Sequence, residues 1–198
     1  MIPMGKTQLF EAICSEKRQV DKQVLEHTIS LAVEIAREGR EGRKIGTLFV
    51  VGDSGEVTKR SKPLILDPLH GHPEESKQIE DPDTRETIKE LAQLDGAFLV
   101  SNAGVVLSAA RYIDAASESL DLPLGLGSRH MAGASISRQT NAVAVVVSES
   151  SMVRMFDDGE LVSEIVPELW MFDGYQSRME GRTFTRRDED ITVIGRAE

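Results

Sequence analysis

The chain of 198 residues has little of what marks several large classes of protein. It holds a single cysteine, Cys14, so no disulfide can form within the chain, and this composition is typical of a reducing compartment. It has no run of about 18 apolar residues, which a transmembrane helix would require. The first eleven residues lack the apolar middle of a signal peptide. These absences lead us to expect a soluble, cytoplasmic protein.

Basic residues are also few beside acidic ones, with 23 Lys and Arg against 33 Asp and Glu and a net charge of −10. A polyanion is repelled by nucleic acid and by anionic membrane surfaces, so we expect neither as a partner. This balance does not exclude a local basic pocket for a phosphate group. The length, together with the 40% of hydrophobic residues, suits one domain with a buried core.

The spacing of apolar residues predicts helices and strands that alternate along the chain. Helices are expected over residues 6–40, 81–94 and 128–140, and buried strands over residues 45–51 and 142–147. Hairpins are expected over residues 95–113 and 151–165, and a late strand near Phe184 and residues 191–194. Residues 52–55 are predicted to form a turn, and the proline-rich residues 61–83 an irregular connection. This order predicts an α/β fold with a mixed central β-sheet flanked by helices.

The most polar cluster in the chain stands just before the third predicted helix, in the segment "LGLGSRH". Gly125 and Gly127 would let a ligand approach the backbone, and Ser128 would cap a helix whose first free N–H groups attract anions. Arg129 adds a forked cation that matches phosphate oxygens, and His130 adds a hydrogen-bond donor or a metal-binding nitrogen. In the alternative interpretation the glycines only turn the chain, Arg129 is solvated and His130 is a structural histidine. The loop has the pattern of neither a Walker loop nor a dinucleotide-binding loop.

Two further polar groups stand where a predicted element ends. Asp95 lies between a helix and a strand, beside the small residues Gly96 and Ala97, where a carboxylate can hold a divalent cation or accept a proton. The alternative is a plain turn. Ser148 and Glu149 close the apolar strand "AVAVVV", where ligands of α/β sheets tend to bind. They could equally be the first solvated residues after a buried segment.

Together these motifs, "DGA" at 95–97, "SRH" at 128–130 and "VVVSE" at 145–149, resemble the diadenylate cyclase family in order, spacing and flanking apolar runs. Members of that family join two ATP molecules into cyclic di-AMP and release pyrophosphate. The resemblance covers about residues 45–165. It implies the diadenylate cyclase fold over residues 44–198, with an N-terminal helical extension over residues 1–43.

Two positions depart from the family pattern. Ser128 replaces a threonine and keeps its hydroxyl, whereas Met131 replaces the second arginine of an Arg-His-Arg motif and loses a charge. The methionine, the long N-terminal helix and the segment "PLILDPLHGHPEE" are similar to the archaeal branch of the family.

The resemblance implies a role for each matched residue. Asp95, Arg129 and His130 would be catalytic: Asp95 would bind Mn²⁺ or Mg²⁺ and help to activate the 3′-hydroxyl of an opposing ATP, and His130 would sit at the phosphates or the metal. The segment "SAARYI" would frame the adenine. Because each copy would hold one ATP, two copies must face each other in a homodimer or a larger homo-oligomer. The ATP-binding residues would be Gly96, Ala97, Tyr112, Ile113, Gly127, Ser128, Arg129, Ser148 and Glu149.

Two other interpretations remain open. Met131 favours a regulatory module that binds ATP or cyclic di-AMP without turnover. His70 and His72, together with Asp95, would suit a metal-dependent phosphohydrolase, although loop histidines without a third and fourth ligand are usually structural.

Overall fold

The computed structural model describes residues 18, 20–114, 122–123 and 125–167 and the backbone of residues 183–188 and 191–196. The strands are Thr47–Val51 (β1), Ser61–Pro63 (β2), Ala97–Val100 (β3), Val106–Ile113 (β4), Val143–Val147 (β5), Val153–Asp157 (β6), Glu160–Val166 (β7), Thr183–Asp188 (β8) and Ile191–Arg196 (β9). The helices are Lys22–Glu38 (α2), Ser54–Lys59 (α3), Pro82–Leu91 (α4) and Ser128–Gln139 (α5), with a 3₁₀ helix at Glu74–Lys77 (η1).

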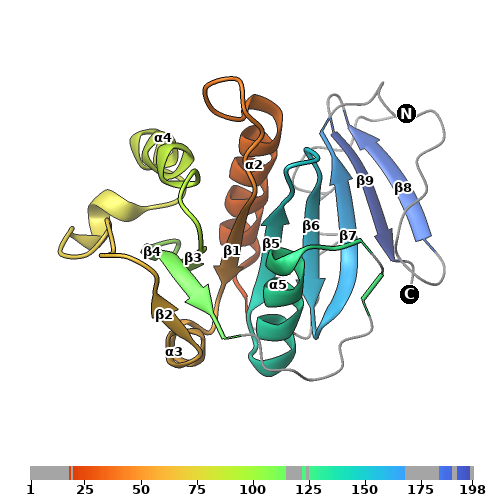
Figure 1. Ribbon diagram of the computed structural model, residues 1–198. Helices are drawn as coiled ribbons and strands as arrows, with labels where there is room; N and C mark the ends of the chain where they lie inside the picture. Colours follow the sequence, from red (N-terminus) through yellow and green to blue (C-terminus); the bar gives the residue numbers. More distant parts are fainter. Residues whose placement is uncertain are drawn as a thin grey trace.

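In this part of the chain the strands form one sheet, in the order β2-β4-β3-β1-β5-β6-β7-β9-β8 (Figure 1). Strands β1 and β3 run parallel, and every other neighbouring pair is antiparallel. The sheet is therefore mixed, and the predicted α/β class is confirmed. The hairpins β3–β4 and β6–β7 and the buried strands β1 and β5 also lie where the sequence predicts them.

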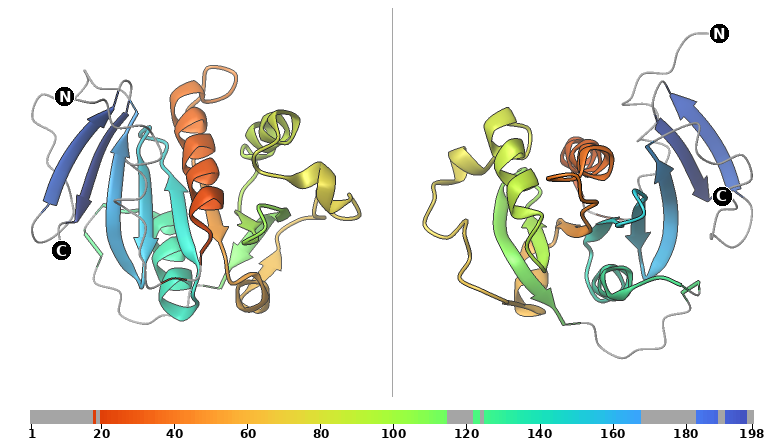
Figure 2. Two further views of the ribbon diagram at one scale, coloured as in Figure 1. Left: turned by 180° about the vertical axis from the view of Figure 1, so that it is seen from behind. Right: turned by 45° about the horizontal axis from the view of Figure 1, so that its top comes forward.

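Helices cover both faces of the sheet (Figure 1, Figure 2). Helices α2 and α4 share a buried cluster with Phe49 and Val51 of β1, whereas α3 and α5 share a second cluster with Leu48 and Val50 of the same strand. Successive side chains of a strand point to opposite faces, so a strand between two helical layers is buried throughout. This is why β1 and β5 have almost no polar residues, and why every residue in both is buried.

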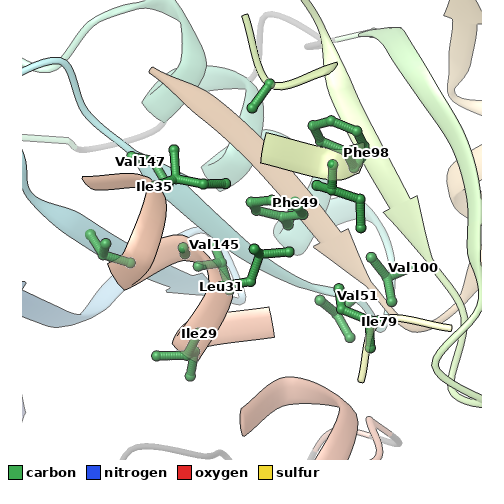
Figure 3. Close-up of a cluster of buried hydrophobic side chains, with 14 of the residues drawn as sticks. Ile29, Leu31, Ile35, Phe49, Val51, Ile79, Phe98, Val100, Val145 and Val147 are labelled. Carbon is green, nitrogen blue, oxygen red and sulfur yellow. The ribbon is translucent and has the colours of Figure 1, made fainter. Parts of the chain in front are cut away.

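The larger of the two clusters lies under α2 (Figure 3). It joins Leu31 and Ile35 of α2 to Phe49 of β1 and Phe98 of β3, whose rings stack with their centroids 5.1 Å apart. Burial of each such side chain stabilises the fold by about 1.5–3 kcal/mol relative to exposure. The cluster thus fixes β1 and β3 side by side, and the starts of these two strands border the candidate site.

Of the helix predicted over residues 6–40, the structure describes α2, which begins at Lys22 and ends at Glu38. Asp21 is its N-cap, with extended backbone and a carboxylate that accepts a hydrogen bond from the Val24 N–H at 3.0 Å. Residues 6–17 lie outside the described residues. Helix α2 packs on the sheet, and the division of the chain at residue 43 stays a prediction.

Polar contacts join α4 to α2. Arg85 donates a hydrogen bond to the backbone oxygen of His27 at 3.2 Å and forms an ion pair with Glu34. Lys89 also pairs with Glu34, at 3.2 Å, and with Glu86 on its own helix, at 2.9 Å. Burial alone would lower the pKa of Lys89, but hydrogen bonds to Glu86 and Glu34 outweigh it and raise that pKa. These contacts hold α4 in place, and its end leads directly into the candidate site.

Three short elements were not predicted. The turn expected over residues 52–55 leads into α3, and the connection expected to be irregular over residues 61–83 contains β2 and η1. These elements hold six, three and four residues, which is too short for a periodic apolar pattern to show. Among the helices that the structure describes, none combines enough length with enough apolar character to cross a membrane.

Candidate active site

A pocket of about 420 Å³ lies on the α5 face of the sheet, between the first turns of α5 and the end of β4. It brings together residues of β1, β4 and α5, the start of β3 with the two residues before it, and Leu64, which follows β2. Seven of the predicted site residues line it, with Arg111 of the segment "SAARYI" and three residues that the sequence did not single out. The lining residues are Leu48, Leu64, Asp95, Gly96, Ala97, Arg111, Tyr112, Ile113, Ser128, Arg129 and Ala132.

The topology of the sheet explains why these distant motifs meet. Ala97, the first residue of β3, pairs with Leu48 on the parallel strand β1 and with Arg111 near the end of the antiparallel strand β4. Thr47 of β1 pairs with Val147, the last residue of β5. The starts of β1 and β3 and the ends of β4 and β5 therefore lie along one edge of the sheet. Residues just before β3 and just after β5 are carried to the same place.

Gly96 is held against the backbone of the neighbouring strand. Its φ is 104°, and a Cβ at this position would lie 2.7 Å from the backbone of both Ala110 and Arg111. The register between β3 and β4 shifts after Ala97, and Ala110 has a φ of 51°, so β4 bulges toward Gly96. Only glycine accommodates both the conformation and the close approach.

We expect Gly96→Ala to destabilise the fold by about 1–3 kcal/mol from the unfavourable backbone conformation alone, before the steric clash is counted. Urea unfolding followed by circular dichroism measures this loss. Gly55→Ala is the matched control, because a Cβ there meets nothing within 4 Å and alanine favours the helix α3. Equal stability of the two variants would contradict the requirement for glycine at position 96.

Arg129 stands between two carboxylates at the mouth of the pocket. Its Nη2 lies 3.2 Å from Oδ1 of Asp95, and its Nη1 lies 3.2 Å from Oε1 of Glu149. Asp95 and Glu149 are largely exposed, with 90% and 69% of their side-chain surfaces accessible. Gly46 makes room for the guanidinium, because a Cβ there would lie 2.8 Å from Nη1. No sequence motif pointed to Gly46, whose role depends on contacts far along the chain.

Helix α5 begins differently from the prediction. Gly127 is the N-cap and Ser128 is the first helical residue, so the expected cap by the Ser128 side chain is wrong. The Gly127 carbonyl accepts hydrogen bonds from the backbone N–H groups of His130 and Met131, at 3.0 and 3.2 Å. The Ser128 hydroxyl is therefore not used as a cap, and Ser128 lines the pocket instead. Gly127, the residue before Ser128, does not itself line the pocket.

Helix α5 approaches β5 closely at Gly133, on its buried face. A Cβ on Gly133 would lie 3.0 Å from Cγ2 of Val146 and 3.3 Å from the Cβ of Ala144, both on β5. This close packing sets the height of the first turn of α5, and so of Arg129, above the edge of the sheet.

Four predicted site residues do not line this pocket: Gly127, His130, Ser148 and Glu149. His130 is buried beneath α5, where its Nε2 lies 3.3 Å from Nη1 of Arg154 and its ring meets Phe156 edge-on. Arg154 in turn pairs with the fully buried Glu164 at 2.7 Å. The Ser148 hydroxyl lies 2.8 Å from that of Ser150, within a local turn. Of the two predicted metal ligands, Asp95 lines the pocket and His130 does not.

The donors at the pocket suit a divalent cation that is bound together with its substrate. In the described ranges no group of three or more His, Cys, Asp or Glu side chains could hold a metal ion by itself. Mg²⁺ and similar hard cations usually bind through one or two carboxylates, with phosphate oxygens and water completing the shell. Asp95 and Glu149, which contact the same guanidinium, match this arrangement. His70 and His72 are exposed and do not line the pocket.

Comparison with known proteins gives consistent matches. Residues 34–161 match the DAC family model, described as "DisA bacterial checkpoint controller nucleotide-binding". The chain is 48% identical over 161 residues to a diadenylate cyclase of Methanocaldococcus jannaschii, covering 81% of this chain and 50% of that protein. It is 40% identical over 153 residues to a diadenylate cyclase of Haloferax volcanii, covering 77% and 56%. The chain thus spans about half the length of the curated relatives it matches.

The fold has a counterpart among solved structures. A crystal structure of a hypothetical membrane-spanning protein from Bacillus cereus superposes with a TM-score of 0.55 at 20% identity, over 79% of this chain and 68% of that one. At this level of identity the likeness concerns the fold alone.

Proposed function

Because the chain belongs to the diadenylate cyclase family, we propose that it condenses two ATP molecules into cyclic di-AMP and two pyrophosphates. The observation that supports this most directly is the pocket in which Asp95, Ser128 and Arg129 lie together, although the sequence separates the first from the others by more than 30 residues. When a hydroxyl attacks a phosphate, the reaction needs an acid side chain near the hydroxyl and positive charge near the phosphate. Asp95 and the start of α5 with Arg129 provide these groups.

Three residues of the pocket have a direct task in this reaction. The Asp95 carboxylate accepts the proton of a ribose 3′-hydroxyl as its oxygen attacks the α-phosphorus of the other ATP. Arg129, the Ser128 hydroxyl and the first N–H groups of α5 hold the phosphate oxygens, where negative charge grows as the bond to pyrophosphate breaks. A divalent cation, Mn²⁺ or Mg²⁺, held by Asp95 with Glu149 nearby, would supply further positive charge at the reacting oxygens.

The product requires two such bonds, one from each nucleotide to the other. One pocket of about 420 Å³ would hold one ATP, so the two nucleotides come from two copies of the chain whose pockets face each other. The exposed position of Asp95 supports this arrangement, because an acid that serves the opposing nucleotide must stand at the mouth of its own pocket. A twofold assembly also matches a twofold product.

The direct test is to incubate the protein with ATP and Mn²⁺ and to separate the nucleotides by chromatography. Cyclic di-AMP is the expected product. A specific observation favours a second candidate, a module that binds ATP without turnover: Met131 brings no charge to the site, and Arg129 is already paired with two acids. Recovery of bound ATP unchanged would favour that module, whereas release of ADP or AMP would indicate a phosphohydrolase.

Arg129→Ala tests how the phosphates are held. We expect ATP to bind about 10- to 100-fold more weakly, because a hydrogen bond from a charged donor contributes about 1.5–3 kcal/mol. Isothermal titration calorimetry measures the affinity. Arg138→Ala, at the other end of α5 and outside the pocket, is the control and should bind ATP as the parent chain does. Unchanged ATP affinity in Arg129→Ala would remove this arginine from the phosphate site.

A further inference from the structure

We propose that His130 positions Arg129 for the reaction and takes no part in it as an acid, a base or a metal ligand. The inference rests on the proposed function, because it takes Arg129 as the residue that holds the phosphates. His130 follows Arg129 directly in the first turn of α5. Arg129 lines the pocket, whereas the side chain of His130 lies beneath the helix, against β6. The two neighbouring side chains therefore have different surroundings, one at the pocket and the other at the sheet.

The contact with Arg154 determines which role the His130 ring can play. A guanidinium has only donors, so where Nη1 of Arg154 lies 3.3 Å from Nε2 of His130, the imidazole nitrogen accepts the hydrogen bond. That nitrogen carries no proton to give, and its lone pair is already used, so it can bind no cation. The residue is also only 7% exposed and does not line the pocket. His130 therefore contacts the sheet and not the ligand.

The arginine that contacts His130 is itself held firmly. Arg154 of β6 lies opposite Glu164 of β7, and its Nε donates to Oε1 of Glu164 at 2.7 Å. The two side chains are 5% and 0% exposed, and separating them would leave each charge buried without its partner. Phe156, on the same face of β6 as Arg154, meets the His130 ring edge-on with the centroids 6.1 Å apart. Two residues of one strand thus fix the position and the orientation of the ring.

His130 is the buried contact between the first turn of α5 and the sheet. Of residues 128–132 it alone is buried, and three of the others line the pocket. Gly133 brings the helix close to β5 further along, but a helix held at one point can still tilt about it. The ring holds the start of the helix, and so determines where the Arg129 guanidinium stands. A misplacement of about 1 Å can lower a reaction rate about 100-fold.

The test compares two replacements of His130. His130→Gln keeps an oxygen that can accept the hydrogen bond from Arg154 but has no titrating nitrogen, whereas His130→Leu fills the space without an acceptor. We expect His130→Leu to bind ATP about tenfold more weakly, because Arg129 is displaced from the phosphates, and to form cyclic di-AMP about 100-fold more slowly. His130→Gln should stay within about threefold of the parent chain in both measurements. Calorimetric titration with ATP, without a divalent cation, gives the affinity, and chromatography gives the initial rate with Mn²⁺.

Ser137→Ala is the matched control. The buried Ser137 hydroxyl accepts a hydrogen bond from the backbone N–H of Gly159 at 3.1 Å, so it joins the last part of α5 to the β6–β7 hairpin, outside the pocket. Its removal should lower the free energy of unfolding but leave ATP affinity and rate unchanged. Urea unfolding of each variant establishes that the chains compared are folded under the conditions of the assay.

Equal losses in His130→Gln and His130→Leu, of affinity or of rate, would overturn the inference, because they would assign the effect to the imidazole itself. An affinity and a rate like those of the parent chain in His130→Leu would also overturn it, since the ring would then only fill space.

Should His130→Leu fail to fold, the double variant Arg154→Met, Glu164→Gln takes its place. It removes the donor to His130 without leaving a buried charge, so it should bind ATP about tenfold more weakly, and normal ATP affinity would overturn the inference. Calorimetry needs no turnover. A parent chain that binds ATP without forming cyclic di-AMP would refute the proposed function, whereas the inference would still stand or fall on the affinities.

Discussion

Replacement of Asp95 by asparagine is expected to lower the rate of cyclic di-AMP formation by about 10³-fold, within the 10²–10⁴ range of general acid–base catalysis. The carboxamide keeps the shape of the side chain, but it cannot accept the proton of a 3′-hydroxyl or offer a negative charge to a cation. The initial rate of product formation, measured by chromatography at saturating ATP and Mn²⁺, tests the expectation.

Binding of ATP should survive this change. Asp95 is 90% exposed, and its contact with Arg129 is a surface ion pair, which contributes about 0–1 kcal/mol to stability. Without Asp95, Arg129 also has one acid less to compete with phosphate, so we expect ATP affinity measured without a divalent cation to be equal to or higher than that of the parent chain.

Asp83→Asn, an exposed acid in the first turn of α4, is the control and should leave both rate and affinity unchanged. Full activity in Asp95→Asn would take this residue out of the mechanism. A fall in rate that matched an equal fall in ATP affinity would assign Asp95 to binding and not to catalysis.

The outline of the fold could be predicted because its signals are local. The apolar runs of β1 and β5 reflect burial on both faces. The helix predicted over residues 81–94 starts at the expected place, because Asp81 is the N-cap of α4 and its carboxylate accepts a hydrogen bond from the Thr84 N–H at 2.8 Å. The order of the motifs predicted that Asp95 and Arg129 would share a site, and the geometry brings them within 3.2 Å. Each of these inferences used residues that are neighbours in sequence or belong to one motif.

The rest of the site depends on partners that are distant in sequence. Arg111 is oriented by Ser61, 50 residues earlier, and Gly46 is required by the position of a guanidinium on α5. The burial of His130 could not be predicted either, because the segment that carries it has no apolar stripe to indicate which side faces the sheet. Its burial is set by Arg154 and by the strand beneath it. No periodic pattern in one segment encodes such contacts.

The buried ion pair between Arg154 and Glu164, next to His130, is expected to contribute strongly to the stability of the fold. Glu164→Gln is expected to lower the free energy of unfolding by about 3–5 kcal/mol, because it leaves the Arg154 guanidinium buried without the carboxylate that neutralises it. The side chains are 5% and 0% exposed, so water cannot take over the lost interaction. Urea unfolding followed by circular dichroism gives the free energy from the midpoint and slope of the transition.

Two companion variants separate the buried charge from other causes. Asp158→Asn changes an acid of the same hairpin that is 70% exposed and pairs with Arg138 at 3.7 Å, so it should cost about 1 kcal/mol or less. The double variant Arg154→Met, Glu164→Gln removes both charges and should recover much of the loss, since the penalty comes from one charge without its partner. If Glu164→Gln cost no more than Asp158→Asn, the buried pair would contribute little to the free energy of unfolding.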